Sequence, residues 1–220
     1  MPGDYKIIRS KRRTLALVIT KDATLEVRAP LKLSLDFIEK FVNKKRSWIE
    51  KKKALVSNKR DRTQPKKFVD GEEFMYEGEV YRLQIGDCES INLSSVLFFP
   101  KKFLPQAKHH LTIWYKNKAL KKIIERVNHY ADKAQLQYKA IKITSAGRSW
   151  GSCSAKGSLN INWRLLMAPP IILDYIVVHE LVHLVERNHS KQFWNKVQKI
   201  LPDYKEHEVW IKQNGDALML

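Results

Sequence analysis

Short apolar runs separated by polar turns occupy the first thirty residues, a pattern typical of β-strands. Residues 14–20 are apolar and β-branched, and residues 21–23 supply a turn. Leu25 and Val27 then begin an alternating return. We therefore expect two strands within residues 5–29.

After residue 33 the apolar residues recur every three or four positions. This spacing predicts a helix that is capped by Ser34 and ends near the lysines at 51–53. Its apolar positions are Leu35, Ile38, Phe41, Val42, Trp48 and Ile49. Residues 57–67 are polar and basic and contain Pro65, so they predict a loop or linker.

Strand patterns return after this linker. Residues 74–83 predict a hairpin that turns at Glu77-Gly78, and residues 90–99 predict further strand. We therefore expect a β-rich N-terminal region over residues 1–104, containing one helix and the basic linker near 57–67.

The second region, residues 105–220, contains longer segments with helical spacing of apolar residues. Residues 106–137 predict a long helix, and its apolar stripe is Ile113, Leu120, Ile123, Ile124, Val127, Tyr130 and Ala134. Residues 141–144 and 159–164 predict strands, and Pro169-Pro170 begins a helix with an apolar face. Strands and helices in this order predict an α+β fold.

Composition narrows the class of protein. Two cysteines make no disulfide framework and suit a reducing compartment. The longest apolar stretch, residues 171–178, is interrupted by Asp174 and is too short to span a membrane. The beginning of the chain lacks a signal-peptide pattern, so we expect a cytoplasmic protein.

The charge is strongly basic and unevenly spread. The net charge of +18 comes from 41 Lys/Arg and 23 Asp/Glu, and half of it lies in residues 44–67, with 11 basic and 2 acidic residues. Such a segment can contact nucleic acid or a nucleotide. The alternative interpretation is a solvated helix end, and the aromatic residues that would mark base stacking are sparse there.

The clearest chemistry lies in the stretch HELVHLVERNH at residues 179–189. His179 and His183 are four residues apart, so on a helix both project from one face and can bind one metal ion. Glu180 is placed to act as a general base on a metal-bound water, and His189 can supply a third ligand to Zn²⁺.

Other zinc proteases suggest alternatives for the third ligand. A metzincin needs glycine at the position of Glu186, and Asn188 is the better turning point here. A gluzincin takes its third ligand further along the chain, where the candidates are Glu206, His207 and Glu208. We favour His189 because of its spacing from the motif.

The strand at residues 159–164 is a candidate to pair with an extended peptide substrate, since strand addition binds a chain independently of its sequence. Asn162 and Arg164 then face the substrate; in the alternative interpretation they are only solvated.

Several motifs in fixed order extend the pattern beyond HExxH: Trp150-Gly151-Ser152-Cys153, Asn162-Trp163-Arg164-Leu165, Asp174-Tyr175 and Asn188-His189-Ser190-x-x-Phe193-Trp194. With them the chain resembles the YgjP-like metallopeptidases, relatives of the SprT-like and WLM zinc proteases, most closely over residues 140–212. The resemblance implies a zincin-like domain with a small antiparallel sheet, a backing helix and the HExxH helix. It also implies zinc held by three histidines, with Glu180 as general base.

We therefore expect a zinc-dependent metallopeptidase acting on peptides or proteins. One alternative keeps the metal but changes the substrate, to nucleotide phosphoanhydrides or to proteins associated with nucleic acid. A second alternative is a non-enzymatic nucleic-acid-binding protein with a structural zinc.

Overall fold

Two separate hydrophobic cores divide the chain. The computed structural model describes residues 5–20, 22–62, 65–147 and 149–220. Residues 1–64 form one unit, the N-terminal unit, and residues 65–220 form a second, the C-terminal unit. The boundary expected after residue 104 falls inside the C-terminal unit, because Phe74 and Phe99 share one core with Leu111 and Tyr115.

The N-terminal unit contains a three-stranded sheet in the order β1-β3-β2. Its strands are β1 (Tyr5–Ser10), β2 (Ala16–Ile19) and β3 (Leu25–Pro30). The first of them was not predicted; it pairs parallel with β3, whereas β2 pairs antiparallel with it. Side chains alternate between the two faces of β3, so Leu25, Val27 and Ala29 all point into the small core of this unit.

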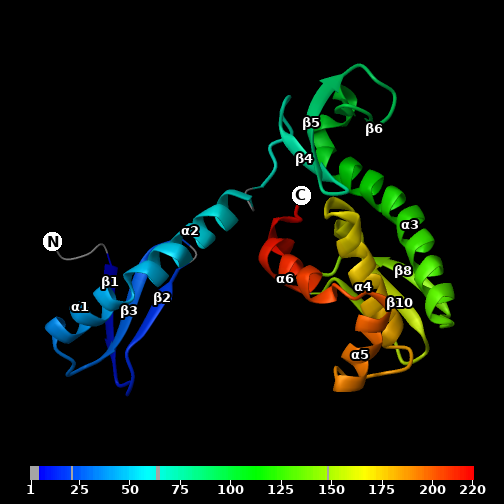
Figure 1. Ribbon diagram of the computed structural model, residues 1–220. Helices are drawn as coiled ribbons and strands as arrows, with labels where there is room; N and C mark the ends of the chain where they lie inside the picture. The colour runs from blue at the N-terminus through cyan, green and yellow to red at the C-terminus, as the bar shows by residue number, and fades with distance from the viewer. Residues whose placement is uncertain (1–4, 21, 63–64, 148) are drawn as a thin grey trace. The chain divides into compact units, whose positions relative to one another are not determined.

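A bent helix crosses this sheet as α1 (Leu35–Lys44) and α2 (Arg46–Arg62) (Figure 1). The Ser34 hydroxyl caps α1 by accepting from the Phe37 N–H at 3.3 Å, which confirms the predicted cap. Lys45 interrupts the regular helix. The prediction of a linker from residue 57 was wrong as far as residue 62, because α2 continues through this stretch; residues 63 and 64 lie outside the described part.

The C-terminal unit begins with a four-stranded sheet in the order β4-β5-β7-β6. Its elements are β4 (Glu73–Tyr76), β5 (Glu79–Gly86), β6 (Asn92–Leu93), β7 (Leu97–Pro100) and the 3₁₀ helix η1 (Lys101–Gln106). The predicted hairpin is confirmed: Glu77 and Gly78 both have positive φ, at 49° and 88°, as a type I′ turn requires.

The long predicted helix is confirmed as α3 (Ala107–Ala134). Its apolar stripe was only partly right, because Ile113, Leu120 and Ile124 are 44%, 40% and 38% exposed. The buried face consists of Ala107, Leu111, Tyr115, Ala119, Ile123, Val127, Tyr130 and Ala131.

A second small sheet, in the order β8-β10-β9, follows α3. Its strands are β8 (Ala140–Thr144), β9 (Gly151–Cys153) and β10 (Ser158–Asn162). β10 pairs parallel with β8 and antiparallel with β9, so the sheet is mixed rather than wholly antiparallel. Arg164 lies outside the strand, in the 3₁₀ helix η2 (Trp163–Met167).

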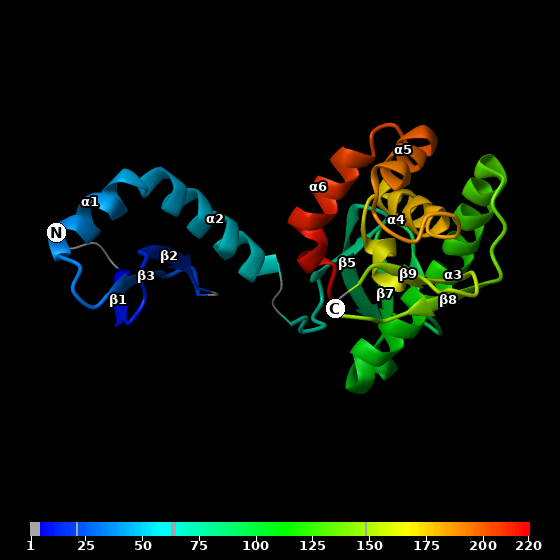
Figure 2. The same cartoon turned by 90° about the horizontal axis from the view of Figure 1, so that it is seen from below.

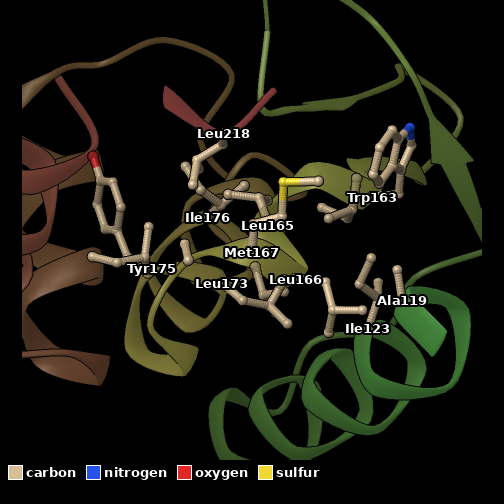
Figure 3. Close-up of a cluster of buried hydrophobic side chains, with 14 of the residues drawn as sticks. Ala119, Ile123, Trp163, Leu165, Leu166, Met167, Leu173, Tyr175, Ile176 and Leu218 are labelled. Atoms are coloured by element: carbon tan, nitrogen blue, oxygen red, sulfur yellow. The ribbon is translucent and has the colours of Figure 1, made fainter. Parts of the chain in front are cut away.

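The last elements of the chain are the helix that carries HExxH and the elements that follow it. They are α4 (Pro170–Val182), α5 (Lys191–Ile200), α6 (Tyr204–Asn214) and the 3₁₀ helix η3 (Gly215–Ala217) (Figure 2). In α4, 10 of 13 residues are buried, so this helix is packed on all sides rather than on one face. Figure 3 shows the apolar side chains of α3, η2 and α4 meeting in this core.

Two polar contacts fix α4 and the segment before it against the rest of their unit. Asp174, only 5% exposed, accepts from the Arg126 guanidinium at 2.6 and 2.8 Å. The hairpin turn donates from the backbone N–H of Glu77 to the carbonyl of Leu166 at 2.7 Å, just before α4 begins. In the described part of the chain, none of the helices is both long and apolar enough to cross a membrane.

Candidate metal centre

Two histidines project from the C-terminal end of α4. His179 lies in its last turn, and His183 is the residue at which the helix ends. The Nδ1 of His183 lies 2.9 Å from the carbonyl oxygen of Glu186, and we assign the proton to Nδ1 so that this bond is donated to the carbonyl. The Nε2 of His183 is then unprotonated and available to a metal.

His189 reaches the same point from the segment that joins α4 to α5. Ser190 ends this segment by capping α5, where its hydroxyl accepts from the Phe193 N–H at 3.3 Å. The Nε2 atoms of His189 and His179 are 3.0 Å apart. One ring nitrogen from each of His179, His183 and His189 lies within 4.8 Å of the others. The sequence-predicted ligands are thus brought together.

These distances can be compared with zinc coordination. Two nitrogens that each lie about 2.0–2.1 Å from a tetrahedral zinc are about 3.3 Å from each other. The separation of 3.0 Å between His179 and His189 therefore needs only a small adjustment. Burial lowers the pKa of His179 to about 3, and it also lowers the pKa of His183. Both rings are neutral near pH 7, as ligation requires.

Aromatic rings hold the three imidazoles in place. The Phe193 ring, fully buried, lies 4.9, 4.6 and 4.8 Å from the rings of His179, His183 and His189. Trp194 stacks on His189, with ring centres 5.7 Å apart and an angle of 27° between the ring planes. Trp194 also stacks on Tyr204, with ring centres 5.3 Å apart and an angle of 15°. The exposed third histidine is therefore oriented by a stack of rings.

Glu180 lies beside the histidines and is 5% exposed. Burial raises the pKa of its carboxyl to about 7. Its Oε2 is buried and forms no hydrogen bond with any residue that the structure describes. A buried carboxylate oxygen without a partner fits the position of a group that receives a proton from a ligand or a metal-bound water.

The close approach of Glu180 to β9 depends on Gly151. A Cβ built on Gly151 lies only 2.7 Å from Oε1 and from Cγ of Glu180. No side chain larger than hydrogen fits there without displacing the carboxyl group. Sequence reasoning did not select Gly151 as a site residue, although it stands in the Trp150-Gly151 motif.

A cavity of about 300 Å³ opens beside this centre, between α4 and α6. Its lining residues are Trp150, Gly151, Tyr175, Ile176, His179, Glu180, Glu208, Ile211 and Lys212. Of the alternative third ligands, Glu208 lines this cavity and pairs with Lys212 at 2.6 Å. His207 approaches the ring of Tyr175 at 6.5 Å, and Glu206 is exposed on α6.

The two proposed substrate-binding side chains are engaged within the chain. Asn162 is buried; its Nδ2 donates to the carbonyls of Ala146 and Ser149 at 2.8 and 3.1 Å, and its Oδ1 accepts from the Arg164 N–H at 3.1 Å. Arg164 donates to the carbonyl of Ser145 at 3.3 Å. Both side chains are thus bonded to the backbone at positions 145, 146 and 149, ahead of β9.

The predicted substrate strand is also corrected. β10 is the central strand of its sheet, with β8 on one edge and β9 on the other, so its backbone has no free edge for a peptide. β8 and β9 are the two edge strands, and β9 is the one that touches Glu180 through Gly151. The position of a strand within a sheet is a long-range property that the pattern of one strand does not contain.

A family model described as YgjP-like, metallopeptidase domain, matches residues 13–214. The chain belongs to the YgjP-like metallopeptidase family. It is therefore a metal-dependent enzyme that hydrolyses peptide bonds, and its substrates are peptides. The match extends across most of the N-terminal unit, so the YgjP-like sequence is not confined to the part that holds the histidines.

No curated protein matches the sequence. Two solved structures are similar to part of this YgjP-like chain. One is the metallopeptidase zymogen abylysin of Pyrococcus abyssi, at 28% identity over 40% of this chain and 90% of that chain, with a TM-score of 0.38. The other is the metallopeptidase zymogen jannalysin of Methanocaldococcus jannaschii, at 24% identity over 42% of this chain and 95% of that chain, also with a TM-score of 0.38.

Proposed function

We propose that this YgjP-like enzyme is a zinc peptidase in which His179, His183 and His189 hold the ion and Glu180 is the general base. The proposal rests on one observation: three ring nitrogens converge within 4.8 Å beside a buried carboxyl group that has no hydrogen-bond partner in the described chain. Three imidazoles plus an open position for water are typical of catalytic zinc.

Bound zinc would lower the pKa of a coordinated water and polarise the substrate carbonyl. Glu180 accepts the proton of the attacking water and transfers it to the leaving amine. Glu180 is buried beside β9, and this burial raises the pKa of its carboxyl group above the usual range. The His183 ring is oriented by its bond to the Glu186 carbonyl.

An extended peptide would bind along the free edge of β9. Trp150 and Ser154 exchange hydrogen bonds with β10: the Asn162 N–H donates to the carbonyl of Trp150 at 2.8 Å, and the Ser154 N–H donates to the carbonyl of Ser158 at 2.9 Å. By the alternation of an antiparallel ladder, Gly151 and Cys153 then turn their backbone groups away from β10. Those groups can bind a peptide next to Glu180 without reading its sequence.

The test compares the zinc-loaded protein with Glu180→Gln in casein digestion. The variant should bind zinc with the same stoichiometry and lose about 10²–10⁴-fold in turnover. Glu206→Gln is the matched control, because Glu206 is exposed on α6 and was an alternative third ligand. It should keep both zinc and activity.

Three results would overturn the proposal. The first is a purified chain that binds no stoichiometric zinc, and the second is Glu180→Gln with unchanged casein cleavage. The third is chelator-sensitive hydrolysis of nucleoside triphosphates without cleavage of casein. That result would mean that the enzyme cleaves a phosphoanhydride bond and not a peptide bond.

We also place this activity in the cytoplasm. Cys88 and Cys153 are both free thiols and both half-buried, which suits a reducing compartment. Fractionation of cells that express the tagged chain tests this directly, and recovery outside the cytoplasm would contradict it.

A further inference from the structure

Positive charge is concentrated in the N-terminal unit. Residues 1–64 contain 18 Lys/Arg and 7 Asp/Glu, a net charge of +11, whereas the remaining 156 residues carry +7. This unit contains none of the proposed metal ligands. Its charge is therefore not explained by the metal centre.

Two aromatic rings are exposed within this charged unit. Phe37 is 53% exposed and Trp48 is 42% exposed. Each directly precedes a buried isoleucine, Ile38 at 0% and Ile49 at 6%. Successive helical residues are about 100° apart, so both rings lie on the same flank of the bent helix, to one side of its core-facing surface.

The bend at Lys45 does not separate these two rings onto different faces. The Lys45 N–H donates to the carbonyl of Phe41 at 3.2 Å, and the Ile49 N–H donates to the carbonyl of Lys45 at 3.0 Å, so helical hydrogen bonding continues through the bend. Phe37 and Trp48 are eleven residues apart, which is about three turns and about 16 Å along the axis.

Lysines lie between and beside the rings. Lys44 is seven residues after Phe37, and Lys51 and Lys52 follow Trp48 by three and four, the spacing of neighbours on a helix face. All three are exposed and form no ion pair with any residue that the structure describes. Phe37, Lys44, Trp48, Lys51 and Lys52 are called the α1–α2 flank below.

We propose that the α1–α2 flank binds single-stranded nucleic acid. Exposed rings stack on unpaired bases of any sequence, and interleaved lysines neutralise the phosphates between them. A duplex offers its phosphates but not the faces of its bases, so it would leave the rings without a partner. A second copy of a unit with a charge of +11 would be repelled rather than bound.

Binding is measured by fluorescence anisotropy of the full-length chain with labelled oligo(dT), oligo(U) and a mixed duplex, each about 20 units long, at several salt concentrations. This length spans the usual site sizes of single-strand binding. Both single strands should bind more tightly than the duplex, and the two single-strand arms distinguish DNA from RNA as the preferred ligand.

Substitutions separate stacking from charge. Trp48→Ala should weaken single-strand binding about 5- to 100-fold, and Trp48→Phe should restore most of it because a ring remains. The double variant Lys51→Gln/Lys52→Gln should reduce the slope of log affinity against log salt by about 1.4. The matched control, Lys108→Gln/Lys121→Gln, removes two exposed lysines from α3 and should leave affinity and slope nearly unchanged.

This inference is independent of the metal centre. Oligonucleotide binding should survive both chelation and Glu180→Gln, so a failed peptidase assay and a failed binding assay are different results. The proposal is overturned if duplex binds as tightly as single strands, or if Trp48→Ala, with an unchanged circular dichroism spectrum, binds as well as the unsubstituted chain. Binding to anionic vesicles that oligo(dT) does not compete away would also overturn it.

Discussion

Replacing Gly151 by alanine places one methyl group between the edge strand and the proposed general base. The Cβ would lie 2.7 Å from Cγ and Oε1 of Glu180 and 2.9 Å from Cδ. The φ angle of Gly151 is not in the left-handed region, so alanine can adopt the same backbone. The perturbation is therefore steric and local.

The size of the effect follows from the missing space. Ordinary contacts between non-bonded carbon atoms are about 3.5–4.0 Å, so the Glu180 carboxyl group or β9 must retreat by about 0.8 Å or more. Misplacement of a catalytic group by about 1 Å can lower a rate about 10²-fold. We expect Gly151→Ala to reduce kcat about 10- to 100-fold, less than removal of the Glu180 carboxylate.

The assay measures casein cleavage and zinc affinity for the same preparations. Zinc affinity should stay within about threefold of the unsubstituted chain, because the lost space adjoins Glu180 and not a histidine. Gly147→Ala is the matched control. It lies just ahead of the same strand, and its added Cβ meets no atom within 4 Å.

Two outcomes would refute this reasoning. Full activity in Gly151→Ala would mean that the position of the Glu180 carboxyl group does not limit turnover. Loss of zinc together with activity would mean that Gly151 supports the whole centre rather than its base.

Two further substitutions test the supports of the centre. Arg126→Met leaves the buried Asp174 carboxylate without its bidentate partner and should lower the free energy of unfolding in urea by about 3–5 kcal/mol; a loss below 1 kcal/mol would contradict the pairing. Trp194→Leu removes the ring stacked on His189 and should weaken zinc binding about tenfold in chelator competition. Trp194→Phe should restore most of that affinity, and equal zinc affinity in all three proteins would show that the stack does not orient His189.

The parts that sequence predicted well depend on neighbours along the chain. His179 and His183 lie on one face because a helix places residues four apart together. The Glu77-Gly78 turn follows from the residues of the turn itself. Features of this kind are determined by about a dozen neighbouring residues, so the sequence of that stretch is enough to predict them.

The parts that sequence missed depend on distant contacts. Gly151 meets Glu180 from 29 residues away, and the central position of β10 depends on β8 and β9 together. On α3, the predicted apolar stripe included Ile113 and Leu120, which are exposed, whereas the smaller Ala119 is buried. Hydrophobicity alone does not show which of two apolar faces meets the rest of the protein.

The three histidines lie on parts of the chain that differ in burial. His179 and His183 belong to a helix buried on all sides, whereas His189 is exposed on the connection to α5. In the proposed metal site the packing of α4 does not depend on the ion, so loading with metal would be separable from folding. A zinc finger, by contrast, unfolds when its ion is removed. We therefore expect this protein to exchange its metal in the native state, so that its activity follows the supply of metal in its surroundings.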